Sequence, residues 1–124
     1  MRKLLFIVED SEACAETLEI ALASLSGIEP RSLPPSRSTI DALKSYAGEV
    51  AAIVTDLHLA RTNGFDLIRE LRADSRFQSV PIVLISGDSD PSLPERALAA
   101  GANAFFAKPY SPAAVRKKLE QLLC

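Results

Sequence analysis

Four stretches of the chain are apolar almost throughout, and each ends abruptly at a polar residue. They are LLFIV at 4–8, AAIVTD at 51–56, VPIVLIS at 80–86 and NAFFA at 103–107. Continuous apolar runs of this length are typical of strands that are buried on both faces, as in a parallel sheet. We therefore expect four buried strands, with the proline at position 81 at the opening of one of them, where a strand tolerates it.

A fifth strand and five helices are expected between and after these runs. The segment IEPRSLPPS at 28–36 predicts a short edge strand and a loop, because its three prolines remove donors that a central strand needs. Apolar residues at helical spacing separate the strands. They predict helices over about 11–25, 38–47, 63–73, 93–100 and from 112 onward.

Two details of these helices can be tested. The second helix is expected to turn Ile40, Leu43 and Ala47 inward. Ser92 and Glu95 have the spacing of a capping box at the start of the fourth helix.

Strands that alternate with helices in this way predict an α/β fold with a parallel sheet, right-handed crossovers and helices on both faces. Strand order 2-1-3-4-5 puts the proline-rich second strand at an edge, which is the flavodoxin-like, doubly wound arrangement. The 124 residues are expected to form one domain, 1–124. In such sheets ligands bind outside the carboxyl ends of the strands.

Composition and charge exclude several classes of protein. The net charge of −2 offers no general attraction to nucleic acid, and no apolar run approaches the roughly 20 residues that cross a bilayer. The start, MRKLLFIVED, lacks the features of a signal peptide, and the two cysteines lack metal-ligand spacing. We expect a cytoplasmic protein with neither a membrane nor a nucleic-acid partner.

Polar residues at the strand ends form the candidate site: Glu9, Asp10, Asp56, Ser86 and Lys108. Three carboxylates at one edge repel, each pair by about 3 kcal/mol at roughly 5 Å and a dielectric constant near 20. Either one carboxylate is protonated or a cation lies among them, and hard oxygen ligands beside a phosphate site suit Mg²⁺. The Lys108 ammonium and the Ser86 hydroxyl suit phosphoryl oxygens. The set favours phosphoryl transfer onto Asp56.

Short motifs around these residues resemble those of the receiver domain of two-component response regulators. They are VED at 8–10, IVTD closing at Asp56, VLIS closing at Ser86 and AKP at 107–109, and the resemblance covers the whole chain. It implies that Asp56 accepts a phosphoryl group from a phosphohistidine of a sensor histidine kinase or phosphotransfer protein.

The resemblance also implies a set of Mg²⁺ ligands. Asp10 and Asp56 would bind the ion directly, Glu9 would act mainly through water, and the backbone carbonyl of His58 would be a further ligand. As a separate hypothesis, the His58 ring affects the access of water, and so the lifetime of the phosphoryl group.

Ser86 and Lys108 would hold the phosphoryl oxygens, and the Lys108-Pro109 peptide would be cis. Phe105 matches the switch aromatic of the family, which fills the space that Ser86 vacates on phosphorylation. The alternative is that Phe105 and Phe106 are neighbouring strand residues, packed on opposite faces of the sheet.

The loop after Asp56 departs from the family pattern. Ala60 stands where proline is usual, and Thr62 and Asn63 stand where methionine and aspartate are usual. We expect a looser loop with the chemistry intact.

The expected output is a change in affinity for an unknown partner, an effector domain or a second copy. In the family this commonly involves the face made by the fourth helix, fifth strand and fifth helix. The chain is then a signalling module and not an enzyme with a separate substrate. One alternative is a Mg²⁺-dependent phosphatase. Many such enzymes have a second aspartate two residues after the nucleophile, and the presence of His58 at that position argues against this alternative. Another is a degenerate receiver that acts only by binding.

Overall fold

The computed structural model describes residues 3–36, 38–59 and 62–123. Its five parallel strands form one sheet in the order β2-β1-β3-β4-β5, as the sequence predicted. The strands are β1 (Lys3–Val8), β2 (Ile28–Leu33), β3 (Val50–Asp56), β4 (Ile82–Ser86) and β5 (Ala104–Ala107). The central strands are almost wholly buried, whereas β2 is only partly buried and lies at the edge that its prolines predicted.

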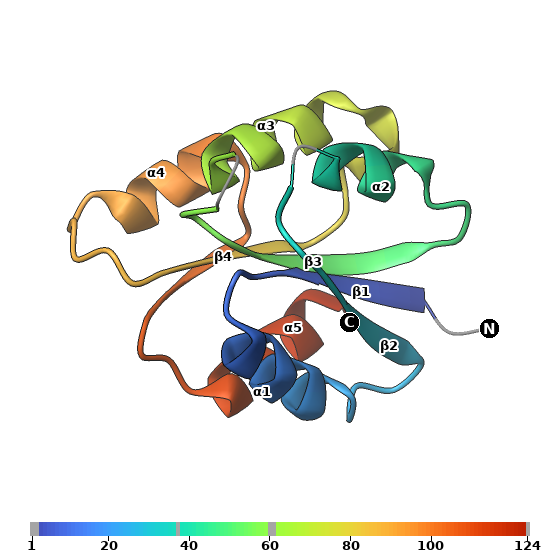
Figure 1. Cartoon of the computed structure of the whole chain (residues 1–124), viewed down its shortest axis with the longest axis horizontal. Helices are drawn as coiled ribbons and strands as arrows, with labels where there is room; N and C mark the ends of the chain where they lie inside the picture. Colours follow the sequence, from blue (N-terminus) through green and yellow to red (C-terminus); the bar gives the residue numbers. More distant parts are fainter. Residues whose placement is uncertain (1–2, 37, 60–61, 124) are drawn as a thin grey trace.

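Helices cover both faces of the sheet (Figure 1). They are α1 (Glu12–Leu22), α2 (Thr39–Ser45), α3 (Gly64–Ala73), the short 3-10 helix η1 (Ser75–Phe77), α4 (Leu93–Ala100) and α5 (Pro112–Leu123). Helices α2, α3 and α4 lie on one face and α1 and α5 on the other, so the core has two apolar layers. Within the residues described, every helix is too short or too polar to cross a lipid bilayer.

Helix α2 is shorter than the sequence predicted. Leu43 is buried and Ile40 is half-buried, as expected, but Ala47 is exposed and lies beyond the end of the helix at Ser45. The backbone becomes extended at Tyr46, whose ring packs edge-to-face on an aromatic ring of β1, 5.5 Å between centroids. This tertiary contact takes the chain out of the helix before Ala47.

The start of α4 also differs from the expected capping box. Ser92 is in the helical region and its side chain makes no cap hydrogen bond. Its hydroxyl donates instead to Asp90 Oδ1 at 2.8 Å, so it belongs to the loop before the helix.

Helix α1 ends earlier than predicted. Ser11 caps its start by accepting the N–H of Cys14 at 3.3 Å, but the helix ends at Leu22. Leu25 stays buried in the turns that follow, and Gly27 has the positive φ of +73° that lets the chain enter β2.

Candidate functional site

The candidate residues share the edge of the sheet where the strands end. The parallel register pairs Val8 with Thr55, and Ser86 with Ala107. Because the chain leaves all of these strands at the same edge, the residues that close or follow them come together. Those that lie at this edge in or beside the core are Glu9, Asp56, Ser86 and Lys108.

Lys108 joins the two buried carboxylates. Its Nζ donates to Asp56 Oδ2 at 2.7 Å and to Glu9 Oε1 at 2.9 Å. The Glu9 side chain is 1% exposed and that of Asp56 is 9% exposed, while Lys108 keeps 27% of its side chain in solvent. Asp56 Oδ1 accepts the backbone N–H of His58 at 3.2 Å. Both oxygens of the Asp56 carboxylate are therefore oriented.

The two acids hold their protons with different strength. Burial, and next the neighbouring Asp56, raise the pKa of Glu9 to about 7, against the opposing effect of Lys108. Burial alone would also raise the pKa of Asp56, but the neighbouring Glu9 and Lys108 side chains outweigh burial and lower it. Burial opposes the charge of Lys108, yet the two carboxylates raise its pKa above the ordinary value. Asp56 is thus the ionised acid of the pair, as a nucleophile needs to be.

The carboxylate oxygens at the site are of the kind that bind a hard cation. Glu9 Oε2 is buried and has no hydrogen-bond partner among the described residues, which is costly for a carboxylate oxygen. Asp56 lies beside Glu9, and Asp10 is exposed at the same strand end. Within residues 3–36, 38–59 and 62–123, however, no three His, Cys, Asp or Glu side chains are gathered as metal ligands. Lys108 is the cation between the acids in this arrangement.

Ser86 is completely buried at the end of β4. Its Oγ accepts the N–H of Asp88 at 3.0 Å, and its carbonyl accepts the N–H of Lys108 at 2.8 Å. The Lys108-Pro109 peptide is cis, as expected. Ser86 and Lys108 are therefore held together through the backbone.

The neighbouring phenylalanines of β5 point to opposite faces. Phe105 packs, half-buried, against the apolar layer under α2, α3 and α4, whereas Phe106 packs against the layer under α1 and α5. This placement agrees with alternation along a strand.

Comparison with known proteins identifies the family. The sequence pattern described as the response regulator receiver domain matches residues 5–120. The chain belongs to this family. The receiver is 29% identical to the chemotaxis protein CheY1 of Helicobacter pylori over 119 residues, which cover 96% of this chain and 95% of that protein.

Solved receiver structures have the same fold. The chemotaxis response regulator CheY4 of Vibrio cholerae superposes with a TM-score of 0.84 at 20% identity, covering 99% of this chain and 100% of that chain. The receiver domain of sensor histidine kinase PA1611 from Pseudomonas aeruginosa PAO1 superposes with a TM-score of 0.82 at 24% identity, covering 99% and 98%. That structure has a magnesium ion coordinated in the active site cleft.

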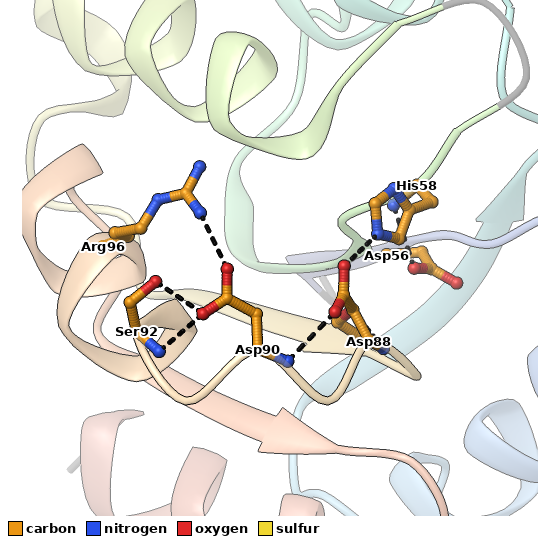
Figure 2. Close-up of polar contacts among 7 residues, drawn as sticks. Asp56, His58, Asp88, Asp90, Ser92 and Arg96 are labelled. Atoms are coloured by element: carbon orange, nitrogen blue, oxygen red, sulfur yellow. Dashed lines mark hydrogen bonds and ion pairs between the residues drawn. The ribbon is translucent and has the colours of Figure 1, made fainter.

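The receiver has a contact beside Asp56 that its sequence did not predict. The exposed ring of His58 pairs through Nε2 with Asp88 Oδ2 at 3.3 Å, so two loops meet at the mouth of the site (Figure 2). Asp88 was not among the candidate residues. The signal in the sequence is a Ser or Asp at every second position from 86 to 92, a pattern that favours side-chain bonds to the backbone two residues further on.

The unusual loop after Asp56 is only partly described. Ala60 lies outside the described residues, so the expectation of a looser loop stays a prediction. Asn63 caps α3, because its Oδ1 accepts the N–H of Phe65 at 2.7 Å.

Proposed function

We propose that this receiver is a phosphorylation-controlled module of two-component signalling, in which Asp56 accepts a phosphoryl group. The donor is a phosphohistidine of a sensor histidine kinase or phosphotransfer protein. The observation that carries the proposal is the position of the Asp56 carboxylate, whose Oδ2 lies 2.7 Å from Lys108 Nζ at the carboxyl ends of the strands, where ligands bind in such sheets.

In the transfer step an Asp56 oxygen attacks the phosphorus, and the bond from phosphorus to the histidine nitrogen breaks. The electron pair of that bond stays on the leaving imidazole, which takes up a proton. Lys108 stabilises the charge on the phosphoryl oxygens, and the Ser86 hydroxyl donates to another of them. Release of phosphate by water returns Asp56 to its carboxylate form.

Magnesium is the proposed cofactor. Receivers of this family generally bind it, and the Pseudomonas aeruginosa receiver holds it in its cleft. Asp10, Asp56 and the His58 carbonyl would bind the ion directly and Glu9 mainly through water. When bound, it neutralises charge on the phosphoryl oxygens. The buried Glu9 Oε2, which finds no hydrogen-bond partner within the described part of the chain, supports this assignment.

The proposed output is a change at the face formed by α4, β5 and α5. Ser86 moves toward the phosphoryl group and Phe105 fills the space that it leaves, so one core has two packings. The altered face then changes its affinity for a downstream partner, an effector domain or a second copy.

Acetyl phosphate and Mg²⁺, followed by intact mass, test the acceptor. Wild type should gain one phosphoryl group, Asp56→Asn should gain none, and chelation of Mg²⁺ should prevent the gain. An equal adduct on both proteins would place the chemistry elsewhere, and no adduct on wild type would indicate a receiver that acts only by binding. Steady turnover of small phosphomonoesters would favour a phosphatase.

A further inference from the structure

The loop from β4 to α4 is held by a ladder of side-chain bonds that starts at Ser86. Ser86 Oγ accepts the N–H of Asp88 at 3.0 Å, and Asp88 Oδ1 accepts the N–H of Asp90 at 3.0 Å. Asp90 Oδ1 accepts the N–H of Ser92 at 2.9 Å, which brings the ladder to the residue immediately before α4 (Figure 2). Each bond joins a side chain to the backbone two residues further on. A shift of one side-chain acceptor therefore moves the backbone of the residue that carries the next acceptor.

Arg96 fastens the far end of this ladder to α3. Its Nη1 lies 3.5 Å from Asp90 Oδ2, on the side of that carboxylate away from Ser92 (Figure 2). Its guanidinium also lies over the Phe65 ring, 5.0 Å from the centroid. Phe65 is buried, and its neighbour Gly64 packs directly against the backbone of Asp56. Arg96 thus connects the loop to the helix that begins beneath the acceptor.

Beyond the pair of Asp88 with His58, few contacts hold this part of the molecule. Residues 87–92 are all exposed, and α4 buries only Leu93, Ala97 and Ala100. A segment with so few apolar contacts is expected to have a low local stability, so a small polar interaction can decide which conformation it populates.

We propose that the ladder and Arg96 form a brace that couples the Ser86 hydroxyl to α4 and favours the conformation without a phosphoryl group. This inference rests on the proposed function. Ser86 Oγ is engaged by Asp88, so its movement toward Asp56 stretches the first bond of the ladder. The shift then reaches Asp90 and opposes its contact with Arg96. Weakening the brace therefore makes the phosphorylated arrangement easier to reach.

Beryllofluoride with Mg²⁺, a stable analogue of the phosphoryl group, tests the brace. Its affinity is measured by titration while the amide signals of Gly87 and Asp88 are followed by NMR. Exposed ion pairs and cation–π contacts are individually weak, so Arg96→Ala should tighten binding by about threefold to tenfold. Asp90→Asn, which keeps the acceptor for Ser92 but removes the charge, should tighten it less.

Arg69→Ala is the matched control. Arg69 also lies over the Phe65 ring, at 5.9 Å, and also has an exposed ion pair, with Asp66 at 3.2 Å. Within the described part of the chain, no hydrogen bond or ion pair joins Arg69 to residues 87–92. It should leave the affinity within about twofold of wild type. Equal effects of Arg96→Ala and Arg69→Ala, or weaker binding by Arg96→Ala in a folded protein, would overturn the brace alone. Failure of wild type to bind would overturn the proposed function, and the brace with it.

Discussion

Lys108 donates to the carboxylates of Glu9 and Asp56, and these two acids differ in how strongly they bind a proton. Glu9 is buried and one of its oxygens has no hydrogen-bond partner among the described residues, whereas Asp56 also accepts the N–H of His58. Each additional donor stabilises the charged form of an acid, so Asp56 stays ionised and Glu9 takes up the proton first. This asymmetry suits the proposed role of Asp56, because an acid that accepts a phosphoryl group must be ionised when it attacks.

The proton on Glu9 should make stability depend on pH. The pKa of Glu9 is about 7 in the folded protein against an ordinary 4.5. The contribution of protonated Glu9 to the stability of the fold is therefore complete below pH 4.5 and is lost as the pH rises through about 7. Without Mg²⁺, the free energy of unfolding should fall by about 1–3 kcal/mol over this window. Urea unfolding at several pH values measures it.

Glu9→Gln is the control, because glutamine has no proton to lose. The variant should show a flatter profile over the same window. The lowered pKa of Asp56 acts in the opposite direction, since its stabilisation is lost as the pH falls below 3.8, and this window does not overlap that of Glu9. A slope that survives in Glu9→Gln would assign the proton to another group.

The pair of His58 and Asp88 should set the lifetime of the phosphoryl group. The His58 ring is 64% exposed and lies across the mouth of the site, held at 3.3 Å from Asp88. Removing the ring in His58→Ala should admit water and speed dephosphorylation by less than about tenfold, a barrier change below about 1.4 kcal/mol. Decay of the phosphoprotein, followed by intact mass, gives the rate. An unchanged rate would remove the ring from this role.

At the scale of elements, the start of α3 depends on a residue without a side chain. A Cβ on Gly64 would lie 2.6 Å from the carbonyl oxygen of Asp56 and 2.9 Å from the Cα of Leu57. Gly64→Ala should therefore displace the acceptor, lower stability by about 1–3 kcal/mol and slow phosphorylation by acetyl phosphate. Gly87→Ala is the control beside the same site, since its nearest neighbour, Lys108, would be 3.8 Å away. Equal rates in the two variants would contradict this account.

Arg72 connects several elements at the end of the sheet where β4 and β5 begin, opposite the candidate site. Its guanidinium donates to Gly101 O at 3.0 Å, Phe77 O at 2.6 Å, Val80 O at 2.7 Å and Asn103 Oδ1 at 2.8 Å. Arg72→Ala should lower the free energy of unfolding by about 2–3 kcal/mol, and Arg72→Lys should recover little of it, because lysine lacks the planar fork. In urea unfolding, Arg69→Ala should cost under about 0.5 kcal/mol.

The elements themselves were largely predictable, because burial and proline leave few choices. The prolines of 28–36 required that this strand lie at an edge of the sheet, and the all-apolar runs required strands at its centre. The position of Asp56 and Lys108 at one edge followed from the topology alone. Ala47 could not be placed, because the end of α2 depends on a contact between Tyr46 and a distant strand. The role of Asp88 was missed because side-chain bonds to a loop backbone depend on local geometry.

At the scale of the whole molecule, two large apolar side chains of the described residues are exposed, on helices that cover opposite faces of the sheet. Among the described residues these are Ile20 on α1, 78% exposed, and Leu98 on α4, 58% exposed. Single exposed apolar residues are common on protein surfaces. Only Leu98 lies on the face that is proposed to change with phosphorylation, so the two side chains give a matched pair for locating the output surface.

Sedimentation with beryllofluoride and Mg²⁺ should then distinguish the faces. If the output is pairing with a second copy through α4, β5 and α5, the wild type should dimerise with the analogue and stay monomeric without it. Leu98→Ser should weaken that dimer by about tenfold, because fully burying a leucine side chain contributes about 1.5–3 kcal/mol. Ile20→Ser should leave it unchanged. If Ile20→Ser weakened the dimer and Leu98→Ser did not, the interface would include α1 and not α4. If the wild type stayed monomeric with the analogue, the partner of the α4 face would be a different protein.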